Sequence, residues 1–270
     1  MYKINNILKE ILTENLGTPK AIILAGAPGA GKGYVLRGLD LGGLKTMNID
    51  DQYIANLKAA NVSLDLKNAS PEDRSIAAKA MATSNKSFKQ DVQDTIAAKE
   101  SFILDGTAAS YNSTVKLKEQ LEETGYEVFM LYVYTDLERS LRQNQSRFDK
   151  SGGDDRSLAP AIVLRTWLGV TKNYMAYKSA FGENFVSVAN TLEDEKLSNV
   201  EDIIKKYLDP FKPTGTKPKT PSQQARSDKQ KAQLNTDVNT LLNDEGVKNI
   251  IDGSVSKEEA QATIEKFLRS

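Results

Sequence analysis

The chain has 270 residues, with 36 basic and 36 acidic side chains, so its formal net charge is zero. This balance excludes a general polyanion-binding surface, although it still allows a local basic cleft. The sequence contains no cysteine and no histidine, which excludes disulfides, thiolate chemistry, cysteine–histidine zinc sites and acid–base catalysis by histidine. Any general base must therefore be a carboxylate, a lysine or a tyrosine.

Residues 1–18 are expected to form an N-terminal helix that packs on or next to the main domain. Five apolar side chains share one helical face: Ile4, Ile7, Leu8, Ile11 and Leu12. Docking to a partner is the alternative. Polar residues interrupt this segment throughout, unlike a signal peptide, and no stretch reaches the ~18 apolar residues needed to cross a membrane. We therefore expect no membrane association and a cytoplasmic setting, which would be the host cytoplasm if the protein is phage-encoded.

A glycine-rich turn follows the apolar run at residues 21–25. It reads G-x-x-x-x-G-K from Gly26 to Lys32, the pattern of a strand, a phosphate-cradling loop and a helix. Glycines let successive N–H groups point at phosphate oxygens, and the following helix and Lys32 add positive charge. An ordinary glycine-rich turn is the alternative. We predict that nucleotide is bound here by Gly26, Ala27, Pro28, Gly29, Ala30, Gly31, Lys32, Gly33 and Tyr34. However, Gly33 stands where the pattern expects a Ser or Thr hydroxyl for Mg²⁺.

From residue 19 to residue 211, apolar runs alternate with helical patterns. The runs predict strands at 21–25, 44–49, 101–104, 127–134 and 184–189. The helical patterns predict helices at 34–39, 52–60, 112–124, 136–145, 159–180 and 197–208, with one or two more starting at Ser70 and Pro71. Such alternation predicts a parallel sheet covered by helices on both faces.

The composition changes after residue 211. Residues 212–227 are rich in Pro, Lys and Thr and read as an extended linker. The pattern of residues 228–270 predicts two or three short helices. Apolar side chains between 238 and 251 could pack against those between 260 and 268. About 40 residues are marginal for independent stability, so this appendage is expected to dock on the main domain or on a protein partner.

Two carboxylates follow predicted strands, at the edge where open parallel sheets bind ligands. Asp50 follows the second strand and could accept a proton from a hydroxyl that attacks a terminal phosphate. Its alternative role is a helix cap, which suits Asp51 better. Asp105 ends the third strand and could hold Mg²⁺ directly or through water. A simple turn residue is its alternative role, and Thr107 could contact the acceptor or the water around the metal.

Four arginines flank a charged, glycine-containing loop at residues 147–156, which is long enough to close over a nucleotide. They are Arg139, Arg142, Arg147 and Arg156. Arginines on such a loop can offset the charge that spreads over a transferred phosphoryl group. Arg147 and Arg156, on either side of the glycines, are the better candidates. Arg139 and Arg142 are equally explained as solvated helix residues, but we include Arg142 with Arg156 among the predicted nucleotide-binding residues.

The phosphate loop at residues 26–33 resembles that of adenylate kinases, which also carry Gly after the Lys. Tyr34 stands where they have Thr, and residues 107–109 (Thr-Ala-Ala) lack their Phe, Pro and monophosphate-binding Arg. The rest of the body resembles the polynucleotide kinase and zeta-toxin branch of the P-loop kinases. Asn48-Ile49-Asp50 matches its Asn-x-Asp at the second strand, Asp105 with Thr107 matches its third strand, and residues 142–160 match its Arg-rich lid.

The resemblance covers roughly residues 20–190 and implies roles for four side chains. Asp50 would be the catalytic base, Lys32 and Arg147 would bind the transferred phosphate, and Asp105 would help to order the metal. Gly33 departs from this branch, which carries Ser or Thr. The implied fold is a three-layer α/β P-loop kinase fold with a five-stranded parallel sheet, here with a small helical C-terminal appendage.

The expected function is an ATP- and Mg²⁺-dependent phosphotransferase. It would move the γ-phosphate to a hydroxyl of a nucleic-acid end or of a nucleotide-sugar. One alternative is a nucleotide-binding component of a larger assembly, such as a phage particle, that is catalytically weak or inactive. A nucleoside monophosphate kinase is a further alternative.

Overall fold

The computed structural model describes residues 17–39, 44–152, 155–191, 200–208, 220–243 and 245–270. The helix expected over residues 1–18 lies almost wholly outside these ranges, as do the first half of the expected linker and the start of the helix expected at 197–208.

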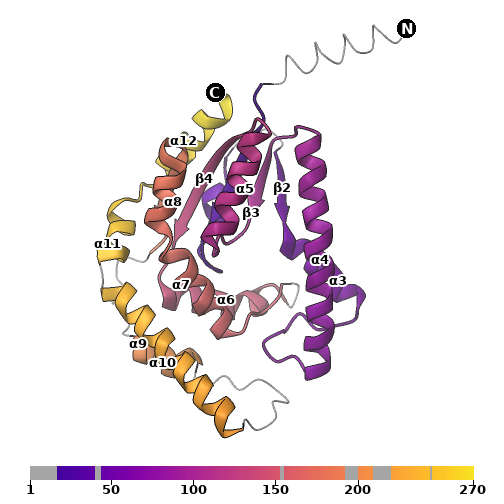
Figure 1. Ribbon diagram of the computed structural model, residues 1–270, viewed down its shortest axis with the longest axis vertical. Coiled ribbons are helices and arrows are strands. Elements are labelled where there is room, and N and C mark those ends of the chain that lie inside the picture. Colours follow the sequence, from indigo (N-terminus) through magenta and orange to yellow (C-terminus); the bar gives the residue numbers. More distant parts are fainter. Residues whose placement is uncertain (1–16, 40–43, 153–154, 192–199, 209–219, 244) are drawn as a thin grey trace.

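A five-stranded, all-parallel sheet forms the centre of the molecule, in the order β2-β3-β1-β4-β5. The strands are β1 (Lys20–Ala25), β2 (Lys45–Asn48), β3 (Phe102–Asp105), β4 (Glu127–Tyr134) and β5 (Phe185–Ala189). In the register, Asp105 is paired with Leu24 of β1 and with Asn48 of β2. The carboxyl ends of these three strands therefore meet at one edge of the sheet (Figure 1). The α/β class and the five-stranded parallel sheet expected from the sequence are confirmed.

Helices cover both faces of the sheet. They are α2 (Lys32–Leu36), α3 (Ile49–Ala59), α4 (Pro71–Ala97), α5 (Tyr111–Glu123), α6 (Leu137–Lys150), α7 (Pro160–Thr171), α8 (Tyr174–Phe181), α9 (Val200–Ile203), α10 (Pro221–Asn243), α11 (Glu245–Asp252) and α12 (Lys257–Arg269), with short 3₁₀ and π turns at Gly182–Asn184 and Ile204–Leu208. Ser70 caps α4 by accepting a hydrogen bond from the Asp73 N–H, as its position before Pro71 predicts.

Alternate residues of β1 belong to two separate cores. Ala21, Ile23 and Ala25 join a cluster with Trp167 of α7 and with side chains of α5, α8, α10 and α11. Ile22 and Leu24 join a cluster on the other face with α2 and α12. This alternation follows from the two-residue period of a strand. A third, smaller cluster joins α3 to α4.

Several predicted boundaries are wrong. The helix expected at 52–60 begins at Ile49, so Asp50 lies in its first turn, and Asn48 rather than Asp51 is the cap. The loop expected at 147–156 is helical up to Lys150, which places Arg147 in the last turn of α6. The helix expected at 159–180 breaks before α8, where the Asn173 side chain donates to the Gly169 carbonyl at 2.7 Å, a local bond that competes with helix continuation.

Helices α10 and α11 join a different core from α12, whereas the sequence pattern predicted that they would pack against it. Val238 of α10 and Val247 of α11 belong to the first core, whereas Ile264 of α12 belongs to the second. The chain changes face at the β5 edge, where the Val255 N–H donates to the Ser187 carbonyl at 2.8 Å. In addition, α10 begins at Pro221, inside the segment expected to be an extended linker. Figure 1 shows α10 beside α9, along one flank of the body.

Candidate functional site

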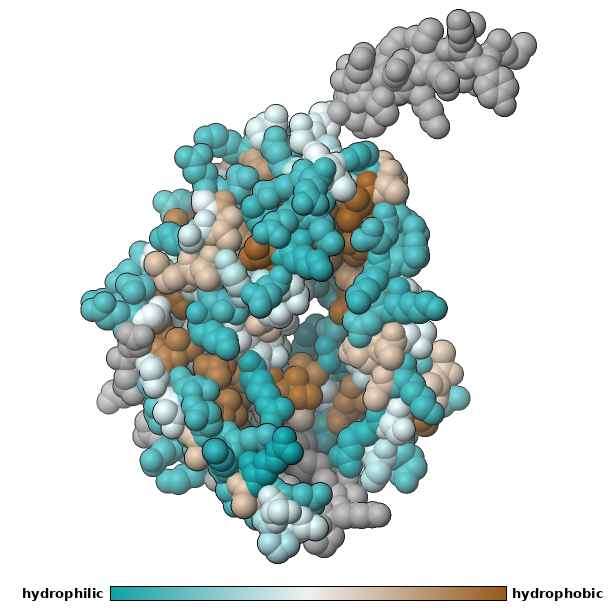
Figure 2. Space-filling view, viewed as in Figure 1, coloured by the Kyte–Doolittle hydropathy of each residue, from teal (hydrophilic) through white to brown (hydrophobic). Residues whose placement is uncertain are grey.

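A cavity of about 1660 Å³ opens at the carboxyl edge of the sheet. Its wall comes from the phosphate loop, from α3, α4 and α6, from the end of β3, and from Ser151 and residues 155–159. Figure 2 shows the surface hollowed between the end of the sheet and α6. This is the edge at which parallel α/β sheets bind their ligands.

The phosphate loop depends on glycine at two close contacts. Gly31, the residue that precedes α2, has a φ of +89°, and a Cβ there would lie 2.3 Å from the Asn190 side-chain nitrogen. That nitrogen donates to the Ala30 carbonyl at 2.8 Å. Gly29 has a φ of +76°, and its Cβ would lie 2.7 Å from Gln143 of α6. A side chain at either glycine would therefore strain the backbone and push away the Asn190 or Gln143 side chain that lies against the loop.

Lys32, the first residue of α2, projects into the site. Its Nζ donates to the Gly26 carbonyl at 3.2 Å and lies 3.9 Å from Oδ1 of Asp105. Burial lowers the pKa of Lys32, and the charge of Asp105 opposes this shift. Burial likewise raises the pKa of Asp105, and Lys32 opposes that shift. Burial without a partner would disfavour the charged form of each group. Lys32 and Asp105 therefore each stabilise the charged form of the other.

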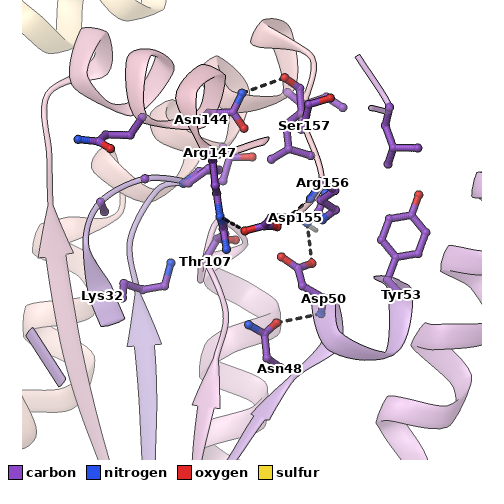
Figure 3. A pocket seen from close by; sticks show the side chains of 18 of the residues that line it. Lys32, Asn48, Asp50, Tyr53, Thr107, Asn144, Arg147, Asp155, Arg156 and Ser157 are labelled. Atoms are coloured by element: carbon purple, nitrogen blue, oxygen red, sulfur yellow. Dashed lines mark hydrogen bonds and ion pairs between the residues drawn. The ribbon is translucent and has the colours of Figure 1, made fainter. Parts of the chain in front are cut away.

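One asparagine connects the two carboxylates of the site. The Asn48 side chain accepts a hydrogen bond from the Asp50 N–H at 2.9 Å and donates to Oδ2 of Asp105 at 3.1 Å. The first bond caps α3 and so fixes the turn that carries Asp50. Figure 3 shows the Asp50 side chain between Lys32 on one side and Tyr53 on the other.

The lid segment brings two arginines to the site, and each is paired with a carboxylate. Nη2 of Arg156 donates to Oδ1 of Asp50 at 2.6 Å, and its guanidinium lies over the Tyr53 ring, 5.5 Å from the centroid. Arg147 forms an ion pair with Asp155 (Figure 3), and Asp155 also accepts the Arg156 N–H at 2.8 Å. The two guanidinium groups therefore enter the cavity from α6 and from the loop that follows it.

The structure brings most of the predicted site residues to the cavity wall. Residues 28–34, Asp50, Asp105, Arg147 and Arg156 all line it. Gly26 and Ala27 are buried, and the Gly26 carbonyl accepts the hydrogen bond from Lys32 Nζ. Arg142, in contrast, does not line the cavity, so the prediction that it binds nucleotide is not supported by its position.

Of the arginines of α6, Arg139 and Arg147 line the cavity and Arg142 does not. Residues three and four apart are neighbours on a helix, so the spacing in the sequence does not distinguish Arg142 from Arg139. Tyr53 and Asn190 also line the cavity, and no local sequence pattern predicts that they do.

The fold and the cavity together define a P-loop kinase, because the cavity combines a phosphate loop with Asp and Arg side chains. Residues 4–200 match the family model described as Zeta toxin. The chain therefore belongs to the zeta toxin family and is a zeta-toxin-like ATP-dependent kinase. A search of curated proteins gives no match.

Among solved structures, the chain is similar to AvrRxo1-ORF1 in complex with ORF2 and ATP, with a TM-score of 0.52 and 15% identity over 94% of this chain and 82% of that one. It is also similar to a structure of the PezAT toxin–antitoxin system of Streptococcus pneumoniae, with a TM-score of 0.49 and 14% identity over 87% of this chain and 95% of that one. At 15% identity, the likeness to AvrRxo1-ORF1 shows a shared fold alone.

Magnesium is the ion that kinase chemistry of this kind implies. In the described part of the chain, no cluster of three or more acidic, cysteine or histidine side chains is placed to hold a metal. Asp105 is a partly buried carboxylate at the cavity wall, and a Cβ at Gly33 would meet nothing within 4 Å. Mg²⁺ commonly takes one or two carboxylates, substrate phosphates and several waters. The donor set fits that kind of site.

Among the helices of the described residues, none combines the length and the apolarity that a membrane span requires.

Proposed function

We propose that the protein transfers the γ-phosphate of ATP to a hydroxyl of a nucleotide-sugar, with Asp50 as the general base. One observation carries this proposal: the carboxylate of Asp50 lines the same cavity as the phosphate loop and Lys32. A base on the far side of the terminal phosphate is what in-line transfer to a hydroxyl requires.

In the proposed reaction, the acceptor oxygen forms a bond to the γ-phosphorus while the bond from that phosphorus to the β,γ-bridging oxygen breaks. The acceptor proton passes to Asp50, and ADP leaves. Arg156 binds Oδ1 of Asp50, which leaves Oδ2 to take the proton. Lys32, Arg147 and Arg156 offset the charge on the transferred group.

Mg²⁺, when bound, would neutralise charge on the β- and γ-phosphates. Asp105 is the side chain that would hold it, directly or through water. Asn48 keeps one oxygen of Asp105 engaged and so orients the carboxylate.

The far part of the cavity favours a nucleotide-sugar over a nucleic-acid end. The part of the wall that comes from α3, α4 and the segment between them includes Tyr53, Leu66, Ala77 and Met81, with the cations Lys67 and Arg74. Apolar and aromatic surface suits a base or a sugar ring, and the two cations suit a diphosphate.

Gly33 is the observation that favours a second candidate, a nucleotide-binding component with weak or no catalysis. The residue offers no hydroxyl to the metal, and direct coordination by a Ser or Thr is the usual arrangement in P-loop enzymes.

Incubation with γ-labelled ATP, Mg²⁺ and a panel of acceptors tests the proposal. The panel holds UDP- and ADP-linked sugars, oligonucleotides with free 5′-hydroxyls, and nucleoside monophosphates. The expected result is label on one or more nucleotide-sugars and no label with the Lys32→Ala variant. Label on oligonucleotides or monophosphates instead would overturn the choice of acceptor, and ATP binding without any transfer would support the second candidate.

A further inference from the structure

Helix α12 lies outside the residues that match the family, which end at position 200. One face of it belongs to the second core of the sheet, where Ala260 and Ile264 are fully buried. A different edge of α12 reaches α2, the short helix that follows the phosphate loop.

Helix α2 has little stability of its own. It spans only Lys32–Leu36, and no side chain caps its N-terminus. Isolated helices of this length do not form in water, and the last carbonyls of any helix have no partner within it. The position of α2 must therefore be fixed by its neighbours.

Gln261 of α12 supplies partners for those carbonyls. Its side-chain nitrogen donates to the Val35 carbonyl at 2.7 Å and to the Arg37 carbonyl at 3.1 Å. Val35 is completely buried. The two bonds hold the C-terminal end of α2.

One turn earlier on α12, Lys257 contacts the middle of the same helix. Its Nζ lies 4.2 Å from the centroid of the Tyr34 ring. Tyr34 lines the cavity and is 53% exposed. The four-residue spacing of Lys257 and Gln261 places both on one helical face, so α12 makes two polar contacts along α2.

We propose that α12 positions the phosphate-loop helix, with Gln261 and Lys257 as positioning residues for nucleotide binding. The phosphate loop runs directly into α2, so the direction of the loop N–H groups depends on how α2 is held. In this chain, a segment beyond the family match holds that axis. The inference rests on the ATP binding proposed above.

The test replaces the Gln261 amide without removing side-chain volume. Gln261→Met is compared with Gln233→Met, because the Gln233 amide donates to Asp237 within α10. Hydrogen exchange of the α2 amides is measured on the nucleotide-free protein, and ATP affinity is measured by calorimetry. Gln261→Met should speed that exchange and weaken ATP binding by about tenfold, the scale of one or two hydrogen bonds. Gln233→Met should change neither.

Lys257→Met provides a second variant that leaves the buried face of α12 intact. It should weaken ATP binding in the same direction, and Lys257→Arg should restore it because the cation over Tyr34 returns.

Unchanged exchange in both Gln261→Met and Lys257→Met would overturn the inference. Faster exchange with unaltered ATP affinity would overturn the role in nucleotide binding. If the wild-type protein binds no ATP, the proposed function fails, while the exchange data still decide whether α12 holds α2.

Discussion

Gly33 is the residue that most distinguishes this phosphate loop from the common pattern. It is the second residue of α2, and a Cβ there would meet nothing within 4 Å. A serine therefore fits without any movement of the loop. In a site built on Asp105 alone, an added hydroxyl would be a new oxygen ligand for Mg²⁺.

We expect Gly33→Ser to lower the Mg²⁺ concentration needed for half-maximal turnover by roughly tenfold, the scale of one charge-assisted contact. The same change should stabilise α2 by about 0.5 kcal/mol, because glycine is a poor helix former. Magnesium titrations of turnover and thermal unfolding measure the two effects.

Gly33→Ala is the matched control, since it gains the helix propensity but not the hydroxyl. It should stabilise the protein without changing the Mg²⁺ requirement. Equal Mg²⁺ requirements in the serine and alanine variants would show that this position is not part of the metal site.

At the scale of single elements, the start of α3 sets the geometry of the site. Asn48 both caps α3 and donates to Asp105. Asn48→Ala should cost about 1 kcal/mol of unfolding free energy. It should also lower turnover by roughly 10- to 100-fold, the usual cost of losing a group that orients a functional carboxylate.

Ser70→Ala separates these two effects. Ser70 caps α4 through the Asp73 N–H, so its loss should cost a similar ~1 kcal/mol with turnover unchanged. Comparable losses of turnover in both variants would mean that Asn48 acts only through stability.

Helix α12 begins with a capping box that depends on pH. The Glu259 side chain accepts the Ser256 N–H, and the Ser256 hydroxyl accepts the Glu259 N–H. The hydrogen bond from the Ser256 backbone, and then that with its side chain, lower the pKa of Glu259. A carboxyl with a lower pKa in the folded state stabilises the protein above its ordinary pKa, and that contribution is lost as the pH falls through the lowered value.

Glu259→Ala should therefore lower the Tm at pH 7 by more than it does near pH 3. Thermal unfolding of both proteins at the two pH values tests this. A difference of the same size at both would contradict the role of the charged form.

The sequence predicts a single element well where the pattern that marks it lies within the element itself. The bounds of β4 are as predicted, because a strand buried on both faces is a continuous apolar run. The phosphate loop is local, so its spacing alone places Lys32 at the cavity. Arg147 was misplaced into a loop, since after Leu141 the end of α6 carries a single apolar residue, Phe148, which is too few to mark a helical face.

The larger errors concern contacts between segments that are distant in the chain. Nothing near Asp50 in the sequence indicates that Arg156 will pair with it, 106 residues away. Likewise, the apolar pattern of α12 predicts a buried face but not which core it joins. Gln261 and Val35 are 226 residues apart, and only the fold brings them together.

At the scale of the whole molecule, the C-terminal helices belong to the body instead of forming a separate unit. Ile264 of α12 is fully buried in the core behind the phosphate loop. Ile264→Ala should therefore cost about 2–5 kcal/mol, a large part of the ~5–15 kcal/mol that a typical protein has. Chemical denaturation measures this loss, and we expect the whole protein to unfold in a single transition.

Ile251→Ala is the control from the same C-terminal segment, since Ile251 is 40% exposed and should cost less than about 1 kcal/mol. A separate unfolding transition for residues beyond 220, or a negligible effect of Ile264→Ala, would contradict the integration of α12 into the body.

The central claim is that Asp50 accepts the proton of the attacking hydroxyl. Turnover of Asp50→Asn on the nucleotide-sugar acceptor, with ATP affinity measured in parallel, tests it most directly. The matched control is Asp51→Asn, because Asp51 is exposed and does not line the cavity. The claim predicts that Asp50→Asn lowers turnover by roughly 10²- to 10⁴-fold while ATP still binds and Asp51→Asn stays near wild type. Wild-type turnover by Asp50→Asn would contradict the claim.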